Sequence, residues 1–426
     1  MDRREFLLAG LSPAALDLPP VRLAVIGTGN RGTGLLRAAL RAPAVQVTVV
    51  CDLRDEAARR AADIVATASG RTPRVLSGSE NAWRGVLEMP EVDAVLIATP
   101  WQWHAAMAVE SMRAGKHTGV EVPIALTYEE CWQLLEVHEQ TRTPCMMMEN
   151  WSFRRDNLAV LNMIRGGLFG RMVHCHCAHS HDCVDHWFFD REGRIRWGGE
   201  FLAKRNADQY PTHSLGPVLS WLDINCGDAF DTISSHATAS LGINEYFRRR
   251  FGPDHPYARQ QWKQSDIVTS VVRTKMGKTV VINYDMQLPR PYDNRWMVQG
   301  TLGLYDEARS AVYMAGRSPR YHEWEPFAPY QEEYEHPWWK AMRQPDTGGD
   351  PLAAGHGGTD DLEVRLFLHA VREKAPLPLD LIDSLTMSAV IAASEESIAR
   401  LGAPVPFPDF TRGRWRERKP YFGLVQ

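Results

Sequence analysis

The sequence predicts an α/β fold, in which a doubly wound parallel sheet is followed by an α+β domain with a large, mostly antiparallel open sheet. Three observations support this prediction. A glycine-rich turn follows an apolar strand at residues 21–26, strands and helices then alternate up to residue 149, and strand-like segments dominate between residues 171 and 300. Alternating strands and helices are typical of a parallel sheet, whereas successive strands favour an antiparallel one.

The first strand runs directly into Gly-x-Gly-x-x-Gly, formed by Gly27, Gly29 and Gly32, and a helical pattern follows. Asp52 lies 20 residues after Gly32, at the end of a second apolar run. Together they form the dinucleotide-binding fingerprint of a Rossmann domain. Its glycines permit the tight turn, the approach of the pyrophosphate and close packing of the helix. Because the acid would bind the adenosine ribose and repel a 2′-phosphate, we expect NAD rather than NADP.

The rest of this domain continues the alternation. Strands are predicted at residues 45–51, 92–98, 118–122 and 145–149, and helices at residues 54–68, 105–114 and 127–141. Thr127 and Glu130 form a capping box at the start of the last helix. Ligands bind beyond the carboxyl ends of such parallel strands. The candidate cofactor-binding residues are therefore Trp101, Gln102, Trp103, His104, Glu121, Val122 and Asn150 at those ends, with Asn30 and Arg31 in the glycine loop.

The second half of the chain changes character. A helix is predicted at residues 156–165, and strands at residues 171–179, 232–239, 267–274, 278–284 and 296–300, with Met276 and Gly277 in a hairpin turn. Residues 310–350, rich in Pro, Trp, Tyr and Glu, predict a long surface excursion, and residues 359–374 and 380–400 predict amphipathic helices. The predicted domains are residues 1–19, a candidate signal or flexible N-terminus; residues 20–150, the NAD-binding Rossmann domain; and residues 151–426, an open-sheet domain for substrate and oligomerisation whose C-terminal helices pack back.

Composition narrows the class of protein. A chain of 426 residues, 44% hydrophobic, is typical of a globular protein with two or three domains. A net charge of −4 and a pI of about 6.4 predict neither nucleic acid nor an anionic membrane as partner. Seven cysteines without a C-x-x-C pair argue against a disulfide framework. No apolar run reaches the roughly 18 residues that span a bilayer.

The first residues resemble a twin-arginine export motif. Arg3 and Arg4 precede Glu-Phe-Leu-Leu, and an apolar stretch continues to Leu16. We therefore expect export to the periplasm, by a route that carries folded proteins and so allows a cofactor to be bound beforehand. Pro13 interrupts the apolar stretch and no clean cleavage site precedes Pro19. A flexible N-terminus on a cytoplasmic protein is the alternative.

Five segments carry a resemblance that covers the chain from about residue 20. They are residues 98–104 (ATPWQWH), 119–123 (GVEVP), 209–217 (QYPTHSLGP), 289–292 (PRPY) with 298–301 (VQGT), and 407–415 (FPDFTRGRW). These segments resemble glycoside hydrolase family 109, the NAD-dependent α-N-acetylgalactosaminidases. That family lies within the glucose-fructose oxidoreductase and inositol dehydrogenase superfamily.

The resemblance implies a glycosidase that keeps NAD tightly bound and recycles it. The sugar is oxidised at C3, a base removes the C2 proton, the aglycone leaves C1, water adds, and the hydride returns. Such enzymes are exceptions to the rule of two catalytic carboxylates. Dehydrogenases of the superfamily usually have a proton-carrying lysine where this chain has Val122, so net dehydrogenation is disfavoured. The proton of the oxidised alcohol would then leave through His213 or Tyr210.

The candidate sugar site centres on Tyr210 and His213, which would share a face if a helix begins there. His213 would then act as a base, and Tyr210 would orient or donate and also contact the cofactor. The resemblance adds His181 as a catalytic residue and His179 and Tyr292 as substrate contacts. The family typically has tyrosine at the His179 position, and an arginine is expected where this chain has Gly198. Both departures fall in the sugar pocket and leave the identity of the sugar open.

Three alternatives accompany this interpretation. Metal-ligand residue types crowd the segment from residue 179 to residue 186, but their spacing matches no standard zinc pattern, so we predict no metal. They are His179, His181, Asp182, Cys183, Asp185 and His186. The other two alternatives are a net NAD-dependent sugar or polyol dehydrogenase and a non-catalytic, NAD-bound sugar sensor. In each case we expect a small-molecule or glycan ligand and a homo-oligomer, since proteins with such open sheets often pair through them.

Overall fold

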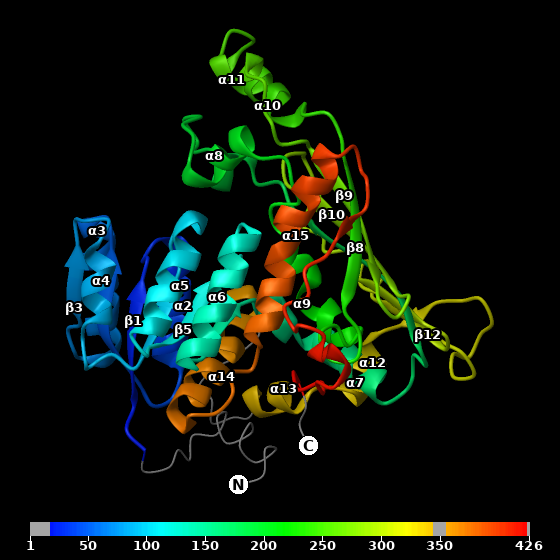
Figure 1. The fold of residues 1–426 in the computed structure, drawn as a ribbon, viewed down its shortest axis with the longest axis horizontal. Coiled ribbons are helices and arrows are strands. Elements are labelled where there is room, and N and C mark those ends of the chain that lie inside the picture. The colour runs from blue at the N-terminus through cyan, green and yellow to red at the C-terminus, as the bar shows by residue number, and fades with distance from the viewer. Residues whose placement is uncertain (1–17, 344–354, 424–426) are drawn as a thin grey trace. The chain divides into compact units, whose positions relative to one another are not determined.

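The computed structural model describes residues 18–343 and 355–423 (Figure 1). The chain forms two compact units. Unit 1 contains the described residues of 1–159, 334–385 and 421–426, and unit 2 contains residues 160–333 and 386–420. The twin-arginine motif lies outside the described residues, so export stays a prediction. In the part of the chain that the structure describes, no helix combines the length and the apolar character that crossing a bilayer requires.

Unit 1 is built on the parallel sheet that the sequence predicts. Its six strands have the order β3-β2-β1-β4-β5-β6, and every neighbouring pair is parallel. The strands are β1 (Val21–Ile26), β2 (Val45–Asp52), β3 (Arg74–Ser77), β4 (Ala94–Ile97), β5 (His117–Glu121) and β6 (Cys145–Met148). The order reverses between β1 and β4, which is the point where doubly wound sheets bind their ligands.

Helices cover both faces of this sheet. Right-handed crossovers place the helices that follow β1 and β2 on one face and those that follow β4 and β5 on the other. The helices of unit 1 are α2 (Asn30–Arg41), α3 (Asp55–Ser69), α4 (Ala82–Leu87), α5 (His104–Arg113), α6 (Tyr128–Thr141), α13 (Pro337–Met342) and α14 (Thr359–Glu373), with short 3-10 turns η1 (Trp101–Trp103), η2 (Asn150–Phe153) and η6 (Gly355–Gly358). Thr127 caps α6 as predicted, because its hydroxyl accepts the Glu130 N–H.

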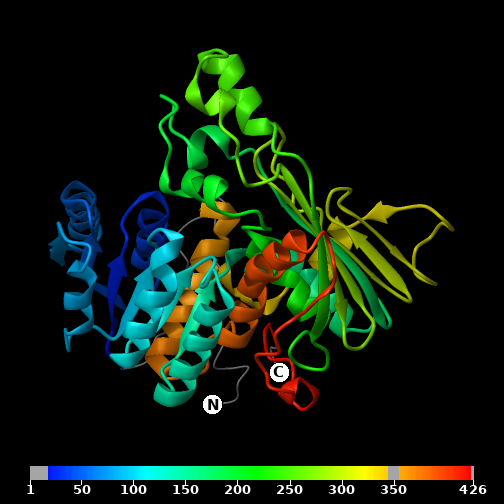
Figure 2. The ribbon, with the colours of Figure 1, turned by 45° about the horizontal axis from the view of Figure 1, so that its top comes forward.

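Unit 2 contains a nine-stranded sheet of order β14-β13-β12-β11-β7-β10-β9-β8-β15. Only the β7–β10 pair is parallel, so the predicted, mostly antiparallel sheet is confirmed. Figure 2 shows most of its strands as green and yellow arrows. They are β7 (Met172–Ser180), β8 (Phe230–Ala237), β9 (Ile267–Thr274), β10 (Thr279–Asp285), β11 (Met297–Gly300), β12 (Gly303–Asp306), β13 (Ala311–Met314), β14 (Glu325–Pro326) and β15 (Val405–Pro406).

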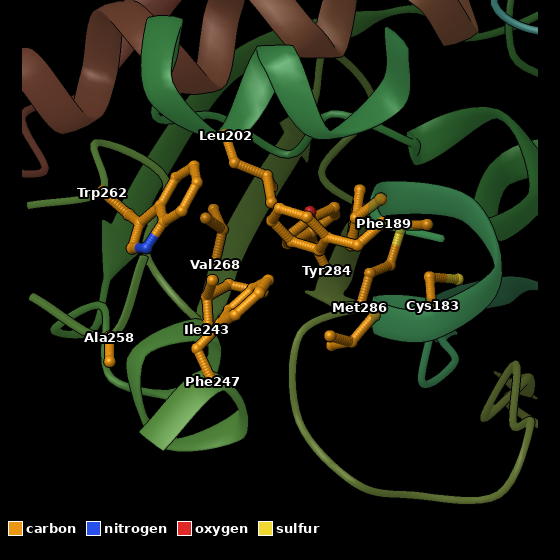
Figure 3. Close-up of a cluster of buried hydrophobic side chains, with 12 residues drawn as sticks. Cys183, Phe189, Leu202, Ile243, Phe247, Ala258, Trp262, Val268, Tyr284 and Met286 are labelled. Atoms are coloured by element: carbon orange, nitrogen blue, oxygen red, sulfur yellow. The ribbon is translucent and has the colours of Figure 1, made fainter. Parts of the chain in front are cut away.

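Unit 2 also contains helical segments, several of which contribute side chains to a hydrophobic core. They are the π-helical turn η3 (Val184–Phe188), α8 (Trp197–Lys204), α9 (Pro211–Trp221), α10 (Gly242–Phe251), α11 (Pro256–Arg259), α12 (Ala328–Glu333) and the 3-10 turn η7 (Arg414–Arg416). Helices α7 (Arg155–Arg165) and α15 (Leu381–Ala399) have residues in both units. Figure 3 shows part of this core, where Phe189, Phe247, Trp262 and Tyr284 pack with smaller apolar side chains.

Two expectations about burial were wrong, the first of them only in part. Residues 315–326 are mostly exposed, as the predicted surface excursion requires, but the flanking residues are not. The stretch from 310 to 343 includes β13, β14, α12 and α13, and Trp338 and Trp339 are completely buried in unit 1, where Trp339 donates its indole N–H to the Phe153 carbonyl. Helix α14 was expected to expose one polar face, but residues 359–371 are all buried. Its charged side chains are accommodated by ion pairs such as Arg41 with Asp361.

Candidate functional site

The glycine loop after β1 has the shape that a dinucleotide needs. Gly27 has a φ of +85°, and a Cβ there would lie 2.6 Å from the Ala98 carbonyl oxygen. A Cβ on Gly32 would lie 1.8 Å from the Gly27 carbonyl oxygen, so both positions require glycine for the fold itself. Gly29 is different, because a Cβ there would meet only the Arg54 side chain, at 3.8 Å. The space above Gly29 is therefore open for a ligand to approach the backbone.

Helix α2 begins at this open position. Gly29 is its N-cap residue, no side chain caps the helix, and its first turn carries no acidic residue. Its uncapped N–H groups and the helix dipole favour an anion at this end. Asp52 holds the loop, since its carboxylate accepts the N–H groups of Thr28 at 2.7 Å and Arg54 at 2.9 Å. These features fit the pyrophosphate of NAD, and the ribose role of Asp52 stays a prediction.

Arg31 makes ion pairs within unit 1. Its guanidinium donates to Glu121 at 2.5 Å and to Asp360 at 2.7 Å. Burial disfavours its charge, but the two carboxylates outweigh burial and raise its pKa. Asn150 donates to the other oxygen of Asp360 at 2.8 Å, while its own Oδ1 is buried and has no hydrogen-bond partner in the part of the chain that the structure describes. His356 also contacts Asp360, at 2.8 Å. Asp360, which the prediction missed, thus joins the predicted residues Arg31 and Asn150, and Arg31 in turn pairs with Glu121.

Two further buried acids surround this network, and the sequence analysis missed both. Glu149 accepts the Ser152 N–H at 2.8 Å and its hydroxyl at 2.6 Å, and burial raises the pKa of the Glu149 carboxyl to about 8. Glu363 is completely buried, and neither carboxylate oxygen has a hydrogen-bond partner among the described residues. Burial raises the pKa of Glu363 well above its ordinary value. No local pattern marks these residues, because apolar strands and a helix surround them in the sequence.

The other predicted cofactor residues follow β4 and β5. His104 is buried, with one ring nitrogen 2.8 Å from the Pro123 carbonyl oxygen and the other 2.7 Å from that of Thr99. The ring therefore connects the two loops, and burial lowers its pKa. Trp101 and Val122 are buried, whereas Gln102 is exposed and Trp103 is half-buried; Asn30, at the first position of α2, is exposed. Direct contacts of these residues with NAD stay predictions.

In unit 2, five predicted side chains form one cluster of rings. The His179 ring stacks on Tyr210 with centroids 4.5 Å apart, and it lies 5.3 Å from His213 and 5.6 Å from Tyr292. His181 lies 5.0 Å from Tyr292. Helix α9 begins at Pro211 with Tyr210 as its N-cap residue, so the expected helix start is confirmed. The Tyr210 hydroxyl lies 3.3 Å from His213 Nε2.

The electrostatics of this cluster separate its histidines. His179 is buried, and burial, followed by the nearby His213 and His181, lowers its pKa well below the ordinary value. Its Nδ1 is buried without a hydrogen-bond partner among the described residues. Asp208, which was not predicted, accepts the Tyr210 N–H at 3.3 Å, and burial raises the pKa of its carboxyl to about 7. The cluster therefore contains an imidazole whose Nδ1 has no hydrogen-bond partner within the described residues, and a histidine–tyrosine pair in contact.

Gly198 packs directly against the side chain of Trp187. A Cβ on Gly198 would lie 3.0 Å from the Trp187 indole, so a larger residue there requires the indole to move. Trp187 also packs edge-on against Tyr210, with centroids 5.8 Å apart. The place where a family arginine was expected is thus beside an aromatic ring. Sequence reasoning missed Trp187 because it lies 11 positions from Gly198.

The chain combines a parallel sheet that carries this glycine loop with a segment that forms an open sheet. This combination defines an NAD-binding protein of the oxidoreductase type. Residues 21–149 match the family model described as "Oxidoreductase family, NAD-binding Rossmann fold". Residues 153–417 match the model described as "Glycosyl hydrolase 109, C-terminal domain". The chain therefore belongs to glycosyl hydrolase family 109, a family of NAD-dependent glycosidases.

Named relatives agree with this assignment. The chain is 39% identical to the "Glycosyl hydrolase family 109 protein" of Stenotrophomonas maltophilia, over 100% of this chain and 98% of that relative. It is 37% identical to the "Alpha-N-acetylgalactosaminidase" of Tannerella forsythia, over 97% of this chain and 91% of that protein. A solved levoglucosan dehydrogenase in complex with NADH and levoglucosan shares the fold, with a TM-score of 0.68 at 21% identity, over 92% of this chain and 100% of the dehydrogenase.

Proposed function

We propose that this protein hydrolyses N-acetylgalactosaminides or closely related glycosides by transient oxidation at C3, elimination across C1 and C2, hydration and reduction. The observation that carries the proposal is the cluster formed by His179, His181, Tyr210, His213 and Tyr292, which joins a proton-transfer pair to an unpartnered polar atom. The printed name of the Tannerella relative supports the choice of sugar.

The glycine loop and the N-terminus of α2 would hold NAD in unit 1. Bound NAD supplies a hydride acceptor that stores the hydride and gives it back, so the cofactor stays bound and is recycled. Gly29 leaves its backbone accessible, and Asp52 stands at the end of β2 for the ribose.

His213 and Tyr210 would carry protons in unit 2. A ketone at C3 acidifies the C2 proton, so a base near neutral pH can remove it. His213 suits this role because its Nε2 contacts the Tyr210 hydroxyl, which can share the proton. His179 does not suit it, because burial keeps its imidazole neutral. Its unpartnered Nδ1 instead suits a hydrogen bond with a sugar hydroxyl.

Trp187 supports a recognition mode that differs from that of an arginine. Its half-buried indole packs beside Gly198 and Tyr210. An aromatic face binds the apolar C–H face of a pyranose by burying it from water, and offers no charge to an acetamido or acidic substituent. On this basis Trp187→Ala is expected to raise KM more than it lowers kcat.

The experiment is hydrolysis of α- and β-linked nitrophenyl glycosides of N-acetylgalactosamine, N-acetylglucosamine, galactose and glucose, without added cofactor. Many turnovers on at least one substrate are expected. In D₂O the released sugar should carry deuterium at C2, which direct displacement at C1 does not introduce. His213→Ala should abolish turnover. His174→Ala is the matched control and should leave turnover intact, because the His174 side chain lies on the face of β7 opposite to that of His179.

Three outcomes contradict the proposal. Nitrophenol release without deuterium at C2 would exclude the elimination route. No release, combined with accumulation of NADH and a keto-sugar when NAD is added, would indicate a net dehydrogenase. Tight sugar binding with neither product would indicate a sensor.

A further inference from the structure

The turn that follows β7 brings together three side chains that bind transition metals. His181, Cys183 and His186 each offer one ligand atom, and these atoms all lie within 4.8 Å of one another. The His181 and His186 rings have centroids 5.1 Å apart. The sequence analysis named these residues among six metal-ligand types but predicted no metal, because their spacing matches no standard zinc motif. In the structure, Cys183 directly precedes the π-helical turn Val184–Phe188, which contains His186.

The backbone holds two of these three residues firmly. The His181 N–H donates to the Asp285 carbonyl at 2.9 Å, and the Cys183 N–H donates to the Met286 carbonyl at 3.1 Å. The Cys183 carbonyl in turn accepts the Phe188 N–H at 3.1 Å, which closes the π-helical turn. Cys183 lies at the edge of the hydrophobic cluster in Figure 3. The group is thus built on strand ends and a hydrogen-bonded turn.

The geometry is close to that of a zinc site. Bonds of about 2.0–2.3 Å from zinc to nitrogen or sulfur place tetrahedral ligands about 3.3–3.8 Å apart. Side-chain rotation of His186 can close the difference from 4.8 Å, because its side chain is half-exposed. The exposed imidazole also gives an ion a path to the buried sulfur. Asp185 lies 4.0 Å from His186 Nδ1, which is too far for a hydrogen bond.

We propose that His181, Cys183 and His186 form a binding site for a divalent transition metal of the zinc type, with a fourth position left for water. Two imidazoles and a thiol select zinc-like ions over Mg²⁺ and Ca²⁺, which prefer oxygen ligands. Binding releases the thiol proton to water, and the thiolate and the two imidazoles donate lone pairs to the ion.

Occupation of this site has a consequence for turnover, and this part rests on the proposed function. His181 faces Tyr292 in the sugar site, with centroids 5.0 Å apart. An ion that takes a lone pair of His181 fixes its ring and removes one proton acceptor. Zinc therefore inhibits glycoside hydrolysis, and its inhibition depends on Cys183 and His186, which lie outside the proposed proton-transfer pair.

The test uses the full chain with its resident cofactor, freed of metal by exhaustive chelation. Zinc is titrated by calorimetry, and Co²⁺ is titrated by absorption, because a Co²⁺–thiolate bond gives a charge-transfer band. We expect one ion per chain and a thiolate band. Loss of an orienting residue behind a ligand already weakens metal binding about 10–100-fold. Cys183→Ser and His186→Asn should therefore each weaken zinc at least about tenfold, and Cys183→Ser should remove the band.

Cys226→Ser and His322→Asn are the matched controls, since both residues lie outside the group. His186→Asn changes an exposed side chain, so it reports on the ligand even if Cys183→Ser fails to fold. The proposal is overturned if the chain binds no zinc, if His186→Asn binds zinc as tightly as the parent, or if the Co²⁺ complex lacks the thiolate band. Calorimetry does not require turnover, so an inactive enzyme that binds zinc refutes the proposed function and not the metal site.

Discussion

Alanine substitutions at two glycines of one loop should affect different properties. Gly32→Ala should lower the stability of the protein, whereas Gly29→Ala should lower its affinity for NAD. In Gly32→Ala the new Cβ must move from 1.8 Å to at least 3.0 Å from the Gly27 carbonyl oxygen, a displacement of 1.2 Å. The loop has little freedom to yield, because the Gly27 N–H bonds the Cys51 carbonyl at 2.7 Å and Gly27 packs against Ala98. Overpacking of this kind costs about 1–3 kcal/mol and sometimes more.

The expected balance follows from these terms. A displacement of 1.2 Å against hydrogen-bonded backbone places the cost at the upper end of this range, about 3 kcal/mol. Alanine gains about 1 kcal/mol over glycine inside a helix, so Gly32→Ala should lose about 2 kcal/mol of unfolding free energy. Gly29→Ala creates no contact closer than 3.8 Å and should change stability by at most about 1 kcal/mol, the scale of an N-cap substitution. Its Cβ instead occupies the space left for the pyrophosphate, so NAD affinity should fall at least tenfold, or about 1.4 kcal/mol.

Denaturant unfolding of the cofactor-free protein measures the first quantity, and calorimetric NAD titration measures the second. A Gly32→Ala protein as stable as the parent would refute the steric argument. A Gly29→Ala protein that binds NAD with unchanged affinity would show that the pyrophosphate does not approach this backbone.

Three further predictions concern single side chains. Asp52→Ala should weaken NAD by about 1–3 kcal/mol through lost charge-assisted hydrogen bonds, and unchanged NAD retention would exclude the ribose role. Asp360→Asn should destabilise unit 1 by about 1–3 kcal/mol, because Arg31 loses one charged hydrogen-bond partner and keeps Glu121; an unchanged free energy of unfolding in denaturant would contradict this. Asp208 has its pKa raised by burial from 3.8 to about 7, so the stability its neutral form provides is complete below pH 3.8 and is lost as pH rises through 7. A shift of one pKa unit corresponds to about 1.4 kcal/mol. The free energy of unfolding of Asp208→Asn should therefore rise relative to that of the parent by about 4 kcal/mol between pH 4 and pH 7.5. If the difference in unfolding free energy between the two proteins does not change with pH, Asp208 is not a buried neutral acid.

Local patterns identified most of the elements. The predicted helices and strands agree with the observed ones within two residues at each end, because apolar periodicity, glycine turns and the Thr127 cap are properties of neighbouring residues. Short, half-exposed strands such as β3 (Arg74–Ser77) gave no such pattern and were missed. The buried Trp338 and Trp339 were misassigned to the surface, since composition alone does not reveal which aromatic residues other segments cover.

The sequence by itself predicted the glycine loop and its acid, because a motif of fixed spacing carries them, and the family resemblance added the five rings of the candidate sugar site. Tertiary structure decided what surrounds them. Asp360 lies 329 positions from Arg31, and no local pattern predicts that they pair. Burial, which makes His179 a neutral ring and Asp208 a weak acid, depends on the whole of unit 2. The grouping of His181, Cys183 and His186 likewise depends on the tertiary structure, since the direction of a side chain follows from the backbone path and not from spacing alone.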